Sequence, residues 1–279
     1  MIQIGLTGWS DHPSITTNPQ NKLGDYAAHF PIVELDSSFY AIPSQERIQQ
    51  WIKNTPETFH FIAKAYGPLT QHTRRADETV PLKQLFHIFR TNFLPLLESG
   101  KLNSYLFQFP PYFTCVKENV SYLRNIRSLM GDVPIAVEFR HTSWFSPDYQ
   151  PETLKFLKKY DFIHAVVDQP QTPHNSVPFV PAVTNPTQAF LRLHGRNYEG
   201  WLGQDQSKDW REYRTLYNYS ETELLTLKAT TLSLAKQAKN VAVIFNNNSG
   251  GHAAGNAKYF QVLLGINYEG LAPRQLDLF

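Results

Sequence analysis

Short apolar runs that suit β-strands recur eight times along the chain, and most are followed by apolar positions at helical spacing. The runs cover residues 2–6, 32–35, 59–63, 104–109, 162–167, 190–193 and 241–245, and one more starts at Ile135. Strands that alternate with helices are joined by crossovers, so they run parallel. The pattern therefore predicts an α/β protein with a parallel sheet.

Several of the predicted helices carry a start signal. Asn21 precedes an apolar pattern at helical spacing, and Ser220 with Glu223 forms a capping box. Pro81 opens a long amphipathic stretch, and Pro151 suits a first helical position. These signals place helices after the first, third, fifth and seventh runs.

Eight strand–helix units within about 265 residues match the size of a single (β/α)₈ TIM barrel. A doubly wound open sheet is the alternative, but it would favour a G-x-G-x-x-G turn, which this sequence lacks. We expect one barrel domain over residues 1–270 and a tail at 271–279. After the sixth strand, residues 169–187 are Pro-rich without a helical pattern, which predicts a long loop that could act as a lid.

Composition narrows the class of protein only moderately. Lys and Arg exceed Asp and Glu by 26 to 24, a surplus too small to predict nucleic-acid or membrane binding from net charge. Cys115 is the single cysteine, so no internal disulfide can form. We find no leader pattern and no apolar run long enough for a membrane span, and we expect a cytoplasmic protein.

A set of motifs, in order along nearly the whole chain, resembles the YecE-like family, domain-of-unknown-function family 72. The motifs are Gly8-Trp9-Ser10, Glu34 to Tyr40, Gln108-Phe109-Pro110-Pro111, Ala136 to Trp144, Arg192-Leu193-His194-Gly195 and Phe245-Asn246-Asn247. The resemblance implies a TIM-barrel fold. It implies no settled activity, cofactor or catalytic residue.

Polar and charged residues stand at the end of nearly every predicted strand. They are Thr7, Trp9, Glu34, Asp36, Lys64, Gln108, Glu138, Arg140, His141, Asp168, Arg192, His194 and residues 246–248. Active sites of TIM barrels lie where the strands end, so these residues predict a pocket at the C-terminal rim. The alternative is a purely structural network in which the carboxylates and the cations neutralise one another.

Three chemistries fit this rim. Lys64, Arg140 and Arg192 could hold an anion, with Gln108 and Asn246 as neutral partners. Glu34 and Glu138 could instead form the carboxylate pair of a glycoside hydrolase. Aromatic side chains could stack on a sugar or a base: Trp9, Tyr40, Trp144, Tyr198 and Trp201. Alternatively, these rings anchor loops.

The third chemistry is a divalent metal held by carboxylates and histidines, which the nearby basic groups disfavour. We therefore expect no metal and no other cofactor. The candidate catalytic residues are Glu34, Asp36, Glu138, His141 and His194, because carboxylates and strand-end histidines can act as general acids or bases. A structural histidine bonded to the backbone is the alternative for either His.

The last five residues resemble the pentapeptide with which bacterial DNA polymerases and repair proteins bind the sliding clamp. Gln275 could bond the edge of a groove, while Leu276, Leu278 and Phe279 fill apolar pockets around Asp277. The alternative is that this tail folds back onto the barrel.

The sequence thus favours an enzyme, with hydrolase as a possible class. The enzyme would act on a phosphorylated or nucleic-acid-derived anionic substrate and would be recruited to the clamp. A carbohydrate-active hydrolase or isomerase is the first alternative. A non-catalytic ligand-binding or clamp-accessory protein is the second.

Overall fold

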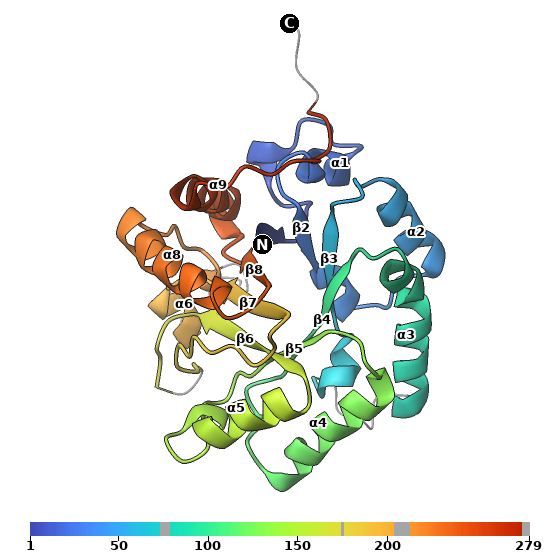
Figure 1. Cartoon of the computed structure of the whole chain (residues 1–279), viewed down its shortest axis with the longest axis vertical. Coiled ribbons are helices and arrows are strands. Elements are labelled where there is room, and N and C mark those ends of the chain that lie inside the picture. The colour runs from blue at the N-terminus through green and yellow to red at the C-terminus, as the bar shows by residue number, and fades with distance from the viewer. Residues whose placement is uncertain (73–78, 174–175, 204–212, 275–279) are drawn as a thin grey trace, which may run out of the picture.

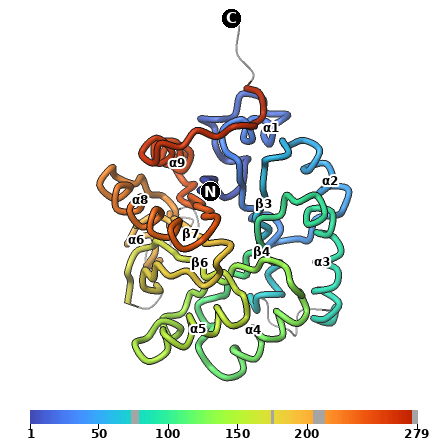
Figure 2. Tube along the Cα trace, in the orientation of Figure 1, coloured from blue at the N-terminus to red at the C-terminus, as the bar shows by residue number. Residues whose placement is uncertain are grey.

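Eight parallel strands close into a barrel in the computed structural model, which describes residues 1–72, 79–173, 176–203 and 213–274. Each strand pairs with the next, and β1 also pairs with β8, so the first and last strands lie side by side (Figure 2). The strands are β1 (Ile2–Thr7), β2 (Ile32–Leu35), β3 (His60–Lys64), β4 (Leu102–Gln108), β5 (Ile135–Glu138), β6 (Phe162–Asp168), β7 (Gln188–Leu193) and β8 (Asn240–Phe245). The predicted (β/α)₈ barrel is confirmed.

Helices surround the barrel as an outer ring (Figure 1). They are α1 (Lys22–Ala27), α2 (Gln45–Lys53), α3 (Leu82–Glu98), α4 (Lys117–Met130), α5 (Gln150–Lys159), α6 (Tyr198–Leu202), α8 (Glu221–Ala235) and α9 (His252–Leu264). Apolar side chains of the ring and the outward faces of the strands share one large core cluster, which includes Val33, Phe61 and Phe107 from the strands and Phe89 and Leu123 from the helices. The burial of this apolar surface is the main force that holds the ring against the barrel.

The helices begin where the sequence signals predict. The side chain of Asn21 accepts a hydrogen bond from the Gly24 N–H at the start of α1. Ser220 and Glu223 form the expected capping box of α8, and a proline stands in the first turn of α5. The caps of α1 and α8 satisfy N–H groups that have no partner inside the helix, and the proline of α5 lacks such an N–H group.

The connections on either side of β7 depart from simple strand–helix alternation. In the described residues between β6 and β7 there is no helix, and the chain instead packs along β6, where Thr184 Oγ1 accepts a hydrogen bond from the His164 N–H. After β7, residues 196–219 show no apolar periodicity typical of a helix, but the short helix α6 forms there. Asn197 caps α6 by accepting a hydrogen bond from the Gly200 N–H. This cap is a local contact that hydrophobic periodicity does not reveal.

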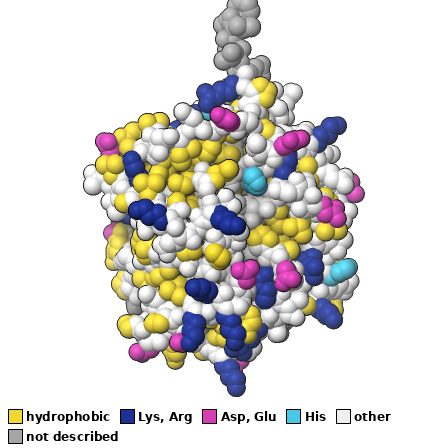
Figure 3. All heavy atoms as spheres, in the orientation of Figure 1, with side chains coloured by type: hydrophobic (Ala, Val, Ile, Leu, Met, Phe, Trp, Pro, Cys, Tyr) yellow, Lys and Arg dark blue, Asp and Glu magenta, His cyan; other side chains and the backbone are white. Residues whose placement is uncertain are grey.

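Charges of both signs mix on the face shown in Figure 3, where Lys and Arg side chains are interspersed with Asp and Glu side chains. This mixture agrees with the small net charge of +2. Among the helices of the described residues, none has the length and apolar character that crossing a membrane would require.

Candidate functional site

A polar layer lies directly above the apolar filling of the barrel. Inward-facing side chains near the middle of the strands form a separate apolar cluster that includes Ile32, Ile62, Leu106, Ala136, Phe190 and Ile244. Two residues further along the chain from these stand Glu34, Lys64, Gln108, Glu138, Arg192 and Asn246. Side chains two apart on a strand share a face, so these six residues, here called the polar layer, point inward at the carboxyl ends.

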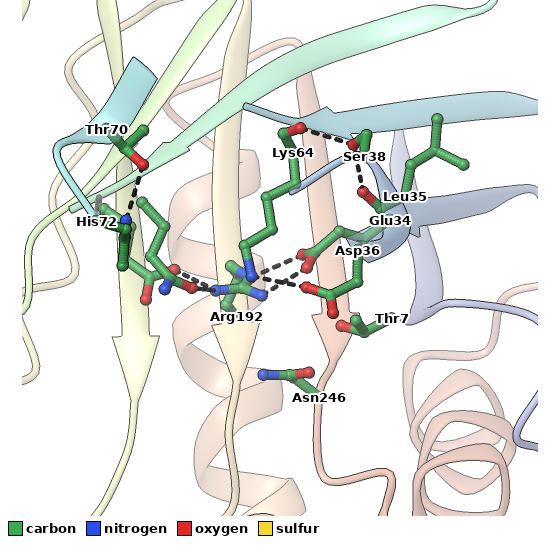
Figure 4. A network of polar contacts seen from close by, with 12 residues as sticks. Thr7, Glu34, Leu35, Asp36, Ser38, Lys64, Thr70, His72, Arg192 and Asn246 are labelled. Carbon is green, nitrogen blue, oxygen red and sulfur yellow. Dashed lines mark hydrogen bonds and ion pairs between the residues drawn. The ribbon is translucent and has the colours of Figure 1, made fainter. Parts of the chain in front are cut away.

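Arg192 is the centre of the polar layer (Figure 4). Its Nε and Nη2 donate to the two carboxylate oxygens of Glu34 at 2.8 and 2.6 Å, which is a bidentate pair. Its Nη1 donates to Glu138 and, at 3.1 Å, to Gln108 Oε1. Glu34, Glu138 and Arg192 are all essentially excluded from solvent. Arg192 therefore ties β2, β4 and β5 to β7 through the barrel interior.

Glu138 is also held from the opposite side. Arg140 Nε lies 2.5 Å from Glu138 Oε1 as an ion pair, and His194 Nε2 lies 3.3 Å from the same oxygen. The Asn246 amide lies 2.8 Å from His194 Nδ1. His194 Nε2 also lies 3.3 Å from Arg140 Nη2, so His194 contacts both members of the Arg140–Glu138 ion pair.

Burial and neighbouring charges set the ionisation of this network. Burial alone would raise the pKa of Glu138, but Arg140 and Arg192 outweigh it and hold that pKa well below its usual range. Burial prevails at Glu34, whose pKa is raised in spite of Arg192 and Lys64. Burial also lowers the pKa of His194, with Arg140 acting in the same direction, so the imidazole is neutral near pH 7.

A cavity of about 520 Å³, here called the rim cavity, opens above the polar layer. Seven of the residues proposed from the sequence line it: Asp36, Tyr40, Lys64, Gln108, Arg140, Trp201 and Asn246. Glu34, Glu138 and Arg192 lie beneath it as a closed, ion-paired floor. The structure therefore contains both arrangements that the sequence left open, an open pocket and a structural ion-pair network, one above the other.

Lys64 and Asp36 form an ion pair in the wall of the rim cavity, with Lys64 Nζ 2.6 Å from Asp36 Oδ1 (Figure 4). The Lys64 ammonium also lies 4.7 Å from the centre of the Phe39 ring. Burial would raise the pKa of Asp36, but Lys64 outweighs it and lowers that pKa. Asp36 is therefore ionised at neutral pH, and its side chain is 36% exposed. Asp36 is the carboxylate that faces the rim cavity.

Two residues of the wall with ionisable side chains, Arg214 and His72, were not proposed from the sequence. Arg214 and Trp201 come from the region after β7, and the Arg214 guanidinium lies 4.8 Å from the Trp201 ring centre. The Arg140 guanidinium lies 5.4 Å from the same ring. His72 also lines the cavity, with Nδ1 2.8 Å from Thr70 Oγ1, and burial lowers its pKa to about 4.

Three other candidates lie apart from the lining of the rim cavity. Trp144 is buried in a stack with Phe139 at a ring-centre distance of 4.1 Å, and its indole N–H donates to the Phe113 carbonyl. His141 Nδ1 accepts from the Ser143 N–H at the turn that follows β5. Trp9 packs edge-on against Trp51. These contacts fit the alternative reading of the sequence, in which such side chains anchor loops.

Asp168 belongs to a separate ion-paired group at the end of β6. Arg196 donates to both of its carboxylate oxygens, and the Tyr219 hydroxyl donates to Oδ2 at 2.7 Å. Across the part of the chain that the structure describes, no three His, Cys, Asp or Glu side chains are grouped so that they could hold a metal ion. The five residues of the clamp-like motif, 275–279, lie outside the described residues.

Comparison with known proteins identifies the family of this chain. The family model described as protein of unknown function DUF72 matches residues 3–277. The chain belongs to the DUF72 family. The UPF0759 protein YunF of Bacillus subtilis (strain 168) is 51% identical over 282 residues, which cover 100% of each chain. The UPF0759 protein YecE of Escherichia coli (strain K12) is 30% identical over 156 residues, which span 55% of this chain and 54% of YecE.

Two solved DUF72 structures share the fold. A DUF72 protein of Enterococcus faecalis V583 has 43% identity and a TM-score of 0.94, over 99% of this chain and 100% of that one. A DUF72 protein of Thermotoga maritima MSB8 has 33% identity and a TM-score of 0.82, over 95% and 100% of the two chains. The resemblance found in the sequence is thereby confirmed.

Proposed function

We propose that this DUF72 barrel is an enzyme that binds a phosphate-bearing substrate in the rim cavity. The observation that carries the proposal is the charge of the cavity wall. Lys64, Arg140 and Arg214 line the cavity, whereas Asp36 is the single carboxylate among its described lining residues. Guanidinium and ammonium groups at a partly closed site favour phosphate oxygens as partners.

The floor supports this role because it fixes the cations without competing for the ligand. Glu138 holds Arg140 from below at 2.5 Å, while its own carboxylate is excluded from the cavity.

The roles of the acidic residues follow from their exposure. Asp36 is ionised and reaches the cavity, so it is the group that can take a proton from a bound substrate or water. Glu34 and Glu138 are fully buried against Arg192, so we assign them to positioning rather than to proton transfer. The same burial disfavours a glycoside hydrolase, in which both carboxylates must flank the sugar.

The aromatic part of the wall bears on the nucleic-acid-derived class of substrate. Tyr40 is 60% exposed, whereas Trp201 is buried, with Arg140 and Arg214 beside its ring. A base could stack on Tyr40 while its phosphate meets the cations. We therefore expect a nucleoside monophosphate to bind more tightly than inorganic phosphate.

Replacing Lys64 by methionine tests the anion site. We expect the affinity for inorganic phosphate to fall about 10- to 100-fold, because a charge-assisted hydrogen bond contributes roughly 1.5–3 kcal/mol. Isothermal titration calorimetry would measure the dissociation constants. Lys155→Met, which removes an exposed lysine on α5, is the matched control and should bind phosphate as the natural protein does. Equal affinity in Lys64→Met and Lys155→Met would contradict the proposal.

We further propose that the pentapeptide 275–279 binds the bacterial sliding clamp. Support comes from the sequence alone, which places Gln275 ahead of three apolar residues around Asp277. Purified clamp should bind the full-length protein in a surface plasmon resonance experiment and should not bind a chain that ends at Pro273. Equal binding by the two chains would rule out the tail as the contact.

A further inference from the structure

A second cavity, of about 530 Å³, lies at the end of the barrel opposite the rim cavity; we call it the lower cavity. It is lined by His29 after α1, by α9 and by the segment that follows α9. The Tyr268 side chain lines it, and its hydroxyl accepts a hydrogen bond from the Ile4 N–H near the start of β1. The lower cavity is therefore distinct from the site at the carboxyl ends of the strands.

Three basic side chains converge on the lower cavity. Lys258 comes from α9, Arg274 from the last described residue and His29 from the end of α1. Its lining holds no Asp or Glu among the residues that the structure describes. Across those same residues Lys258 has no ion-pair or hydrogen-bond partner, and Arg274 makes one bond, from Nε to the Ala28 carbonyl at 3.4 Å.

The acidic group that acts on His29 is already engaged elsewhere. Asp25 acts electrostatically on His29, but its Oδ2 accepts from the Thr17 and Asn18 N–H groups at 2.5 Å and its Oδ1 from the Thr17 hydroxyl. The charges of Lys258 and Arg274 are therefore left without a carboxylate beside them in the described structure.

The mutual repulsion of these groups is visible in their ionisation. Burial lowers the pKa of His29 to about 4, and Lys258 and Arg274 act in the same direction. Burial and Arg274 lower the pKa of Lys258 as well. An anion placed among the three groups would relieve this repulsion.

We infer that the lower cavity is a second anion site, which binds a small phosphate-bearing molecule between Lys258 and Arg274. The amides of Gln261 and Asn267 can supply neutral hydrogen bonds to it. The remaining lining is apolar and suits an organic portion of the ligand: Val262, Ile266 and Leu271.

Arg274 connects the lower cavity to the segment that follows α9. The chain leaves α9, crosses to α1 (Figure 1) and bonds there through the Ala272 N–H to the Ala27 carbonyl at 3.0 Å. A phosphate shared by Lys258 and Arg274 would join α9 to the end of this crossing segment. Ligand binding would thus hold the segment against the barrel.

The test follows His29 in the full-length protein by NMR, with inorganic phosphate as the probe and sodium chloride at equal ionic strength as the blank. The charged groups that face His29 are Asp25, Lys258 and Arg274. Phosphate should raise the pKa of His29 by about one unit or more, since an anion favours the imidazolium. A His29 pKa that does not respond to phosphate would overturn the inference.

Variants separate this site from the rim cavity. Lys258→Met should raise about tenfold the phosphate concentration that is needed to shift the pKa of His29, because one of the two cations is lost. Lys64→Met, at the rim, should leave it unchanged. Lys258→Met should also fold, since it removes an unpaired charge, and Arg274→Met provides a second test. A phosphate response that survives both Lys258→Met and Arg274→Met would contradict the inference.

Discussion

Replacing Arg192 by methionine is expected to destabilise the protein by about 3–5 kcal/mol, the cost typical of breaking a buried ion pair from one side. Methionine fills much of the same space but leaves Glu34 and Glu138 as two buried carboxylates without their shared partner. The free energy of unfolding, from urea titration followed by circular dichroism, measures this loss.

The dependence on pH gives this prediction a specific signature. Without Arg192 the pKa values of the two buried carboxylates rise, so the folded state binds protons more tightly than the unfolded state does. A raised folded-state pKa adds stability as the pH falls, so the deficit of Arg192→Met should shrink from pH 7 towards pH 5. Arg47→Met, an exposed change on α2, is the control and should cost little at either pH. An Arg192→Met protein as stable as the control would contradict the buried network.

Glu138→Ala is expected to destabilise the protein by a similar amount, about 3–5 kcal/mol. The substitution removes the carboxylate between Arg140 and Arg192 and leaves a void in the barrel floor. Arg192 keeps its bidentate pair with Glu34, but Arg140 loses its 2.5 Å ion pair. Differential scanning calorimetry would report the loss as a lower melting temperature.

Acid should reduce the difference between the natural protein and Glu138→Ala. The folded-state pKa of Glu138 is depressed, so its stabilising effect is present above the unfolded-state pKa and is lost as the pH falls through the folded-state value. Glu138→Gln keeps the volume and one accepting oxygen, and should therefore cost less than Glu138→Ala. An unchanged melting temperature in Glu138→Ala would show that Glu138 is neither buried nor paired.

The polar layer could be predicted because it depends on strand periodicity alone. Once Ala136 and Phe190 are recognised as inward-facing, Glu138 and Arg192 must share that face, two residues on. A parallel barrel then brings all such strand ends to one rim. Periodicity alone does not predict the pairing of Arg192 with Glu34. That contact depends on barrel closure, which pairs β8 with β1 and so brings β2 within three strands of β7.

The loops were harder to predict for a physical reason. Trp144 and His141 follow β5 in sequence, but the 3₁₀ turn Thr142–Phe145 directs Trp144 into the aromatic stack and uses His141 as its cap. Arg214 was missed because it lies well beyond the strand end, and the chain between β7 and α8 has no regular period. Side chains placed by turns and long connections depend on contacts that no local pattern records.

The charged residues at the strand ends form two groups, a buried floor and the wall of the rim cavity. The strand-end charges looked like one set in the sequence, whereas the structure separates them by exposure. Glu34, Glu138 and Arg192 are buried and ion-paired in the barrel floor, and Lys64, Asp36 and Arg140 face the rim cavity. The proposed function depends on the residues that face the rim cavity, whereas the expected losses of folding stability concern the floor residues. Mutations in the two groups should therefore have different effects.

The most direct test of the account is a crystal structure of the protein grown with selenate, a tetrahedral anion that can be located by its anomalous scattering. We predict an anomalous peak in the rim cavity, bounded by Lys64, Arg140 and Arg214, and its loss in crystals of Lys64→Met. A rim cavity without a selenate peak in the natural protein, at a concentration that saturates binding in solution, would contradict the proposed anion site.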